Sequence, residues 1–100
     1  MVATAVSKNG IPIRLTDERW QHIVVGHSEL VGMKQEVLDT IAKPERILAG
    51  NEAELLAIHI VETGKWLVVI YRELEADGFV ITAFLTRRER SLNRRLQVWP

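Results

Sequence analysis

The fold is decided by Leu55-Leu-Ala-Ile-His-Ile-Val61, which is followed by the loop Glu62-Thr-Gly-Lys65 and then by Trp66-Leu-Val-Val-Ile-Tyr-Arg72. The two outer runs are rich in β-branched and aromatic residues, which favour extended backbone. The loop between them is short and contains a glycine, as hairpin loops of this length do. This stretch therefore predicts a β-hairpin.

Two further strands are predicted around this hairpin. Glu75-Ala-Asp-Gly78 is a turn signal that precedes the extended run Phe79–Thr86, and Arg46–Ala49 is a short extended run on the other side. Strands joined by short turns pair antiparallel, since a parallel pair needs a long crossover. The second half of the chain therefore predicts a meander of three or four antiparallel strands.

The first half of the chain carries the signals of two short helices. Thr16 is suited to cap a helix, and Asp17 and Glu18 follow it in the first turn, where the helix dipole favours acids. This helix is predicted to run from Asp17 to about Gly26. A second helix ends before Pro44 and is predicted from apolar residues at helical spacing, namely Met33, Val37, Leu38 and Ile41.

The order of these elements predicts an α+β fold in which two N-terminal helices pack on one face of a three- to four-stranded antiparallel sheet. Residues 1–100 are interpreted as a single domain. Residues 1–14 are predicted to form a hairpin arm around Asn9-Gly10, with Pro12 keeping its strand at a sheet edge. The predicted core consists of Trp20, Ile23, Val24, Val37, Leu38, Ile41, Ile58, Val68, Ile70, Ile81 and Leu85.

Strand alternation indicates which side chains of the last strand can face a ligand. Successive side chains point to opposite faces. The apolar series Phe79, Ile81, Ala83 and Leu85 is predicted to face the core, which leaves Val80, Thr82, Phe84 and Thr86 on an open face. In the preceding strand Tyr71 and Arg72 are adjacent, so at most one of them faces the same site unless the strand bulges.

The composition is that of an ordinary folded chain, with 13 basic and 13 acidic residues and no cysteine. A disulfide framework and a catalytic thiol are thereby excluded. No apolar run is long enough to span a bilayer and the N-terminus lacks the pattern of a secretion signal, so a cytoplasmic protein is expected. The basic charge is concentrated in the C-terminal segment 87–100, which contains Arg87, Arg88, Arg90, Arg94 and Arg95.

Histidines and arginines are the residues that could act on a phosphodiester. Histidine both accepts and donates a proton near neutral pH, and arginine binds phosphate oxygens through a planar fork of donors. His22 and His27 lie five residues apart, about 140 degrees around a helix, so they cannot bind one metal ion from one helical face. Each also has a plain structural interpretation: a surface residue for His22 and a partly buried helix end for His27. His59 is interpreted as cross-strand packing.

Five segments of the chain occur in an order that is found in a known family. They are Leu15-Thr-Asp-Glu-Arg-Trp-Gln-His-Ile23, His27-Ser-Glu-Leu30, Leu67-Val-Val-Ile-Tyr-Arg-Glu73, Asp77-Gly-Phe-Val-Ile-Thr-Ala-Phe-Leu-Thr86 and Val98-Trp-Pro100. Through them residues 14–100 resemble a family of small bacterial and phage-associated proteins (PBECR-type) in the Barnase/EndoU/colicin/RelE-like nuclease superfamily. The family commonly has a proline after the second histidine and a tyrosine in the last strand, where this chain has Ser28 and Phe84.

The resemblance implies a RelE- or Barnase-like fold and an endoribonuclease that needs neither metal nor cofactor. The RNA 2′-hydroxyl would attack the adjacent phosphate, and a small acidic antitoxin would hold the enzyme inactive as a toxin–antitoxin pair. The implied catalytic residues are His22 and His27 as acid and base, Arg72 as phosphate ligand, and Thr82 and Thr86 as hydroxyl donors. The implied substrate-binding residues are Tyr71 and Phe84, which would stack on a base, and Arg87 and Arg88, which would extend the substrate track.

Two other interpretations remain open at this point. The same fold could serve as a non-catalytic module that binds RNA or a protein through its basic edge, since fold does not determine reaction. The chain could also be a structural protein that forms a homodimer through an exposed edge strand. The arginine-rich end would then be a solvated segment.

Overall fold

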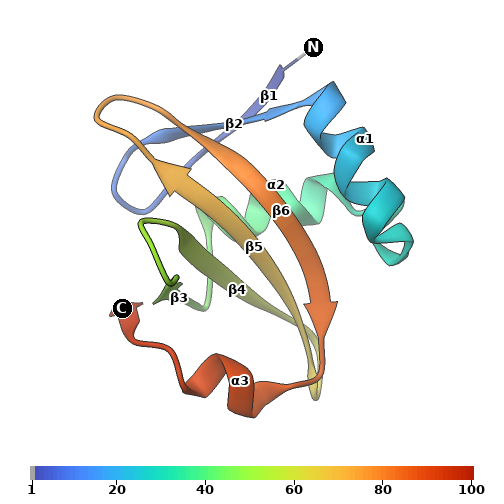
Figure 1. Ribbon diagram of the computed structural model, residues 1–100, viewed down its shortest axis with the longest axis vertical. Coiled ribbons are helices and arrows are strands. Elements are labelled where there is room, and N and C mark those ends of the chain that lie inside the picture. Colours follow the sequence, from blue (N-terminus) through green and yellow to red (C-terminus); the bar gives the residue numbers. More distant parts are fainter. Residues whose placement is uncertain (1) are drawn as a thin grey trace.

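The computed structural model describes residues 2–100, and it contains a single curved sheet with short helices packed against it (Figure 1). Within these residues the sheet has seven strands in the order β1-β2-β6-β5-β4-β3-β7. No helix in this part of the chain is long and apolar enough to span a membrane. The elements are β1 (Val2–Val6), β2 (Pro12–Thr16), α1 (Asp17–Gly26), the 3₁₀ turn η1 (Ser28–Leu30), α2 (Lys34–Ala42), β3 (Arg46–Ala49), β4 (Leu55–Glu62), β5 (Lys65–Glu73), β6 (Gly78–Thr86), α3 (Glu89–Asn93) and β7 (Gln97–Trp99).

This architecture corrects the predicted fold class. The chain does not place two N-terminal helices on a three- to four-stranded antiparallel sheet, and the RelE- or Barnase-like arrangement expected with it is wrong. The sheet is mixed, because β2 pairs parallel with β6 through Ile13 opposite Gly78 and Arg14 opposite Phe79. Gly78 is crowded from both sides: a Cβ atom there would lie 2.2 Å from the Arg72 carbonyl oxygen of β5 and 2.7 Å from the Ile13 Cδ1 atom of β2.

The N-terminal hairpin is part of the sheet rather than a separate arm. β1 and β2 pair antiparallel around the predicted turn, and Ala5, Ile13 and Leu15 are buried in the main core. β2 is an interior strand, which corrects the expectation that Pro12 would keep it at an edge. Pro12 is tolerated because it lies opposite Val6 and precedes the first residue that pairs with β6, so no N–H is needed on that side.

The local signals for the helices and for the β3–β6 strands are confirmed. The Thr16 hydroxyl accepts a hydrogen bond from the Arg19 backbone N–H at 3.0 Å, so α1 begins where the cap predicts. α2 ends two residues before Pro44. The strands β4, β5 and β6 extend the predicted ranges by one or two residues at their ends, and β3 matches its predicted range.

The sheet has two differently covered faces. Alternate residues of β5 divide between them: Leu67, Val69 and Tyr71 face one side, whereas Trp66, Val68 and Ile70 face the other. The first side, called the helix face here, is covered by α1, η1 and α2 and holds the main core. The other side, called the second face, is covered in part by α3, where Leu92 packs with Leu48, Leu56, Ile58 and Val68.

A β-bulge in β6 changes the predicted alternation. Ile70 of β5 lies opposite Thr82 and the next residue, Tyr71, lies opposite Val80, so Ile81 is the extra residue. Val80 is therefore buried on the helix face, and Phe79, opposite Arg72, lies on the second face. These two positions are the reverse of the prediction. After the bulge, Ala83 and Leu85 face the main core as predicted.

The predicted core is confirmed in part. Five of its members are fully buried, namely Ile23, Val37, Ile41, Ile58 and Val68. Six others retain partial exposure, namely Trp20, Val24, Leu38, Ile70, Ile81 and Leu85. The principal omission is Tyr71, which has the largest fully buried side chain.

The C-terminal segment is structured. β7 pairs antiparallel with β3, with Ile47 opposite Trp99, and so forms one edge of the sheet. The Lys8 ammonium of the first hairpin turn lies 4.9 Å from the centroid of the Trp99 ring, a cation–π contact between the two ends of the chain. The sheet is therefore curved enough to bring its first turn to its last strand.

Candidate functional site

The second face carries a groove of about 470 Å³ between the sheet and the segment around α3. Its floor comes from β4, β5 and β6, and its wall from the arginine-rich segment. The floor is apolar and partly aromatic, and the wall is polar and cationic. The residues that line the groove are Leu56, Ile70, Phe84, Thr86, Arg88, Ser91, Leu92 and Arg95.

Arginines from two parts of the chain lie on this face near the groove. Arg88 and Arg95 line the groove, and Arg72 lies two residues beyond Ile70 on the same side of β5. Arg95 is held in place because its Nη1 donates to the Ala49 carbonyl oxygen at 3.4 Å and to Asn51 Oδ1 at 3.1 Å. The Arg72 guanidinium is exposed to solvent. Two cations of the C-terminal segment therefore line the groove, and a third lies on the same face of β5.

One carboxylate lies close to these cations. Glu54 Oε1 accepts a hydrogen bond from the Glu52 backbone N–H at 2.7 Å. This bond, together with the charges of Arg95 and Arg72, holds the pKa of the Glu54 carboxyl below its usual range. The Glu54 carboxylate is thus stabilised in its charged form next to two arginines, and an incoming anion would compete with it for them.

The predicted threonines lie on the second face. Thr82 is opposite Ile70, and Thr86 lines the groove. The Thr86 hydroxyl accepts a hydrogen bond from the Arg88 backbone N–H at 3.1 Å, which fixes the point where the arginine segment leaves β6. Thr86 therefore has a structural role in placing Arg88.

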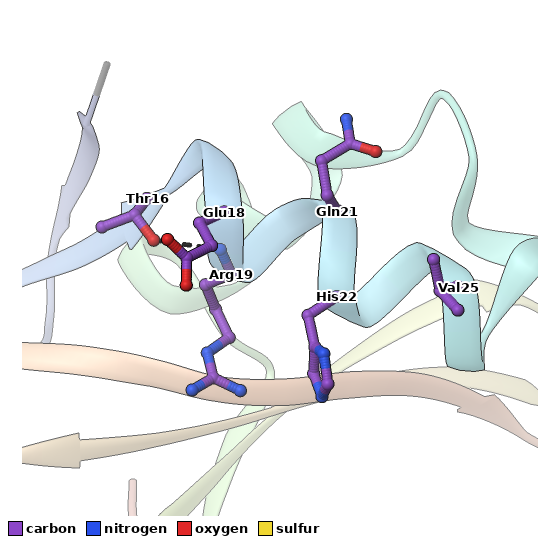
Figure 2. Close-up of a pocket in the computed structure, with 6 residues that line it drawn as sticks. All are labelled: Thr16, Glu18, Arg19, Gln21, His22 and Val25. Atoms are coloured by element: carbon purple, nitrogen blue, oxygen red, sulfur yellow. Dashed lines mark hydrogen bonds between the residues drawn. The ribbon is translucent and has the colours of Figure 1, made fainter.

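α1 lies beside β6 along the part of its edge that β2 does not reach. The β2–β6 pairing covers Gly78 and Phe79, and further along Arg19 Nη1 donates to the Ile81 carbonyl oxygen at 3.5 Å. Figure 2 shows that the Arg19 and His22 side chains both point toward this strand, whereas Gln21 points away. His22 is exposed. The helix thus brings one histidine and one arginine to the edge of β6.

The hollow beside these residues is a shallow surface feature of about 500 Å³. All its lining residues come from α1 and its cap, namely Thr16, Glu18, Arg19, Gln21, His22 and Val25. Because a single helix contributes the whole lining, this hollow does not enclose a ligand from two sides. We therefore regard it as the approach to the β6 edge rather than as a separate site.

His27 connects the end of α1 with the second face. Its ring centroid lies 6.2 Å from that of Phe84, with the two rings inclined at 35°. Its Nδ1 lies 3.6 Å from Glu29 Oε2 in an ion-pair geometry. His27 is half-buried, so part of its imidazole remains open to solvent. A histidine, an aromatic ring and a carboxylate therefore gather at the β6 edge.

Two of the predicted site residues lie elsewhere. The Tyr71 side chain is fully buried on the helix face, so its ring has no exposed surface on which a base could stack. Arg87 does not line the groove and borders an adjoining shallow hollow of about 230 Å³ with Glu29, Lys65 and Thr86. His59, for which cross-strand packing is the expectation, lies on β4 with its Nδ1 3.2 Å from Glu45 Oε2, away from the other two histidines.

Sequence reasoning missed Arg19 and Ser91, and it named Arg95 only as part of the basic C-terminal segment. Arg19 precedes His22 by one helical turn, a spacing that places both on one side of α1 and could have been used. Arg95 and Ser91 join the groove only because the C-terminal segment turns back over the sheet. No local signal indicates that return.

Among residues 2–100, no three histidine, aspartate or glutamate side chains gather as ligands for a metal ion. Comparisons with models of protein families, with curated proteins and with solved structures find no match to this chain.

Proposed function

We propose that the protein binds RNA on the second face of its sheet and cleaves it without a metal ion. The observation that carries this proposal is the contact between His27 and Phe84, because it joins a proton-transferring side chain to a face bordered by Arg72, Arg88 and Arg95. Arginines bind phosphate, and exposed aromatic rings stack on unpaired bases. The sequence resemblance to the nuclease family described above supports the same chemistry.

In the proposed reaction the RNA 2′-oxygen attacks the adjacent phosphorus. A bond forms between the 2′-oxygen and phosphorus, and the bond from phosphorus to the 5′-oxygen of the next nucleotide breaks. One histidine of the pair His22 and His27 removes the 2′-hydroxyl proton, and the other gives a proton to the leaving 5′-oxygen. Arginine donors stabilise the additional negative charge on the phosphoryl oxygens.

The arrangement also defines where the substrate would lie. Phe84 would support a base beside His27, and Arg88 and Arg95 would hold phosphates along the groove. Thr82 and Thr86 supply hydroxyl groups on the same face. A small acidic antitoxin that covered these arginines would compete with RNA, and a cytoplasmic location belongs to the same proposal because the substrate RNA is found there.

The test is to incubate purified protein with a labelled single-stranded RNA in the presence of a chelator, and to measure binding and cleavage separately. Binding with cleavage supports the proposal. Binding without cleavage would favour the second candidate, a non-catalytic RNA-binding module. That candidate rests on the groove itself, whose arginines and Phe84 can bind RNA without either histidine. If neither is observed, both candidates fail.

A further inference from the structure

β1 is an edge strand whose outer side is not paired with any strand of residues 2–100. Its sequence is Val2-Ala-Thr-Ala-Val6, without charge or proline. Val2 and Val6 are exposed by 54% and 56%. Proteins usually protect edge strands with charged residues, proline or bulges, because free backbone groups invite pairing with another strand. The opposite edge, β7, is only three residues long and is followed by Pro100.

The alternation of hydrogen-bonded pairs between β1 and β2 shows which backbone groups of β1 face outward. The Ser7 N–H donates to the Ile11 carbonyl oxygen at 2.9 Å, so Ser7 and Ile11 form a hydrogen-bonded pair of the hairpin. Such pairs alternate along an antiparallel ladder. Ala5 and Ala3 are therefore bonded to β2, whereas the N–H and C=O groups of Val2, Thr4 and Val6 point to the free edge.

The sequence of β1 reads the same in both directions about Thr4. If a second β1 is placed antiparallel with Thr4 opposite Thr4, the register also puts Val2 opposite Val6 and Ala3 opposite Ala5. In this register the two strands bond through the backbone groups of Val2, Thr4 and Val6, which are the groups that point outward. Thr4, the centre of the symmetric sequence, is therefore also a residue whose backbone can bond to the partner. Side chains directly opposite in an antiparallel pair share a face, so the exposed valines of one copy cover those of the other.

We propose that two copies of this chain associate through β1, antiparallel and centred on Thr4, so that the two sheets become continuous. The partner strand is β1 of a second copy for three reasons. The sequence of β1 is symmetric about Thr4, its outward backbone groups match those of an antiparallel copy, and it contains no charged residue that would repel a copy of itself. A two-fold axis perpendicular to the sheet relates the copies, as an isologous interface requires. Because a strand of only five residues forms the interface, we expect a weak dimer that dissociates on dilution.

The first test is sedimentation velocity over a wide concentration range with the wild type and with Thr4→Pro. Proline removes the Thr4 N–H that points to the partner, but none that bonds to β2, so the hairpin ladder stays intact. We expect a wild-type dimer and at least a tenfold higher dissociation constant for Thr4→Pro. Thr4→Ser is the matched control and should dimerise as the wild type does. Circular dichroism confirms that both variants are folded.

The register is tested with charges at the two valines. The double variant Val2→Lys with Val6→Lys places like charges opposite each other twice, and it should be monomeric. The double variant Val2→Lys with Val6→Glu places opposite charges opposite each other twice, and it should dimerise. The two variants have the same pair of altered positions, so a difference between them reports the pairing and not a loss of folding.

A covalent test uses the absence of cysteine in the chain. Hydrogen-bonded antiparallel pairs have Cα atoms about 5.5 Å apart, which is within disulfide range. Thr4→Cys should form a disulfide-linked dimer under mild oxidation, whereas Val25→Cys, at an exposed position on α1, should not. A wild type that stays monomeric at every concentration, or a dimer that Thr4→Pro leaves unchanged, would overturn the proposal and leave the edge to a different strand.

Discussion

The rings of His27 and Phe84 lie 6.2 Å apart, although one follows helix α1 and the other belongs to the second face of the sheet. The contact is possible because β2 pairs only with the first residues of β6, Gly78 and Phe79, so that α1 lies beside the later part of the β6 edge. A side chain at the end of α1 can therefore reach around this edge. Without that gap a strand would separate the arginine groove from His22 of α1 and from His27, which follows the helix.

Replacing His22 or His27 with alanine should lower the rate of RNA cleavage by about 10²- to 10⁴-fold, the usual effect of losing a general acid or base. The matched control is His59→Ala, because His59 pairs with Glu45 on another part of the sheet and should not affect the rate. Rates are measured under single-turnover conditions with folded protein. If His59→Ala lowers the rate as much as the other two variants, the assignment to α1 fails.

Arginines that line the groove should contribute more to RNA affinity than arginines of the same C-terminal segment that do not line it. The double variant Arg88→Gln with Arg95→Gln removes two cations that line the groove, so we expect it to bind RNA more weakly. The dependence of its affinity on salt should also be shallower, by about 0.7 in log–log slope for each single-strand phosphate that is no longer neutralised. The control Arg90→Gln with Arg94→Gln removes the same charge from the same segment. Equal effects in the two variants would mean a diffuse electrostatic attraction.

Local structure was predictable from the sequence because its signals lie within a few residues of one another. The Thr16 cap marks the start of α1, Pro44 marks the end of α2, and the β-rich composition of 55–72 indicates the two strands of one hairpin. The mixed sheet was not predictable in this way, since the pairing of Ile13 with Gly78 joins segments far apart in the chain. The hairpin of residues 1–14 is therefore predicted as a separate arm, because no local signal indicates that it pairs with β6.

The site was predictable only after the bulge in β6. From Thr82 onward the alternation places the threonines and Phe84 on the second face, as predicted. Before the bulge the faces are exchanged, because one extra residue at Ile81 reverses every earlier position. Tyr71 was an ambiguous case in the sequence, and its burial follows from the side of β5 that it shares with Leu67 and Val69.

Tyr71→Phe should leave the protein as stable as the wild type or more stable by about 1 kcal/mol. The Tyr71 hydroxyl is buried and has no hydrogen-bond partner within residues 2–100, and an unpaired buried polar group costs about 1 to 3 kcal/mol. Urea denaturation at neutral pH measures the difference. A loss of stability would show that the hydroxyl has a partner, such as a bound water molecule.

Tyr71→Phe should also change how the free energy of unfolding depends on pH in alkaline solution. Burial, and to a lesser extent the charge of Glu73, raises the pKa of Tyr71, which is the only tyrosine in the chain. Above about pH 10 the unfolded chain releases this proton while the folded chain keeps it, so stability falls as pH rises, by up to about 1.4 kcal/mol per pH unit. Tyr71→Phe should lack this part of the decline. If the free energies of unfolding of the wild type and of Tyr71→Phe fall in parallel as pH rises, this prediction is wrong.

Truncation of core residues should distinguish the main core from the bulge. Leu67 is fully buried on the helix face, so Leu67→Ala should lower the free energy of unfolding by about 2 to 5 kcal/mol. Ile81 is partly exposed at the bulge, so Ile81→Ala should cost less than half as much. Chemical denaturation of both variants measures these values. A larger loss for Ile81→Ala would mean that the bulge residue packs in the core.

The most direct test of the proposed reaction compares an RNA oligonucleotide with one that carries a single 2′-deoxynucleotide at the cleaved position, both in chelator. Because the attacking oxygen belongs to the substrate, the all-ribose strand should be cut to a product that ends in a 2′,3′-cyclic phosphate or its hydrolysis product, and the substituted strand should stay intact at that position. Cleavage of both strands at the same site and rate would contradict the account.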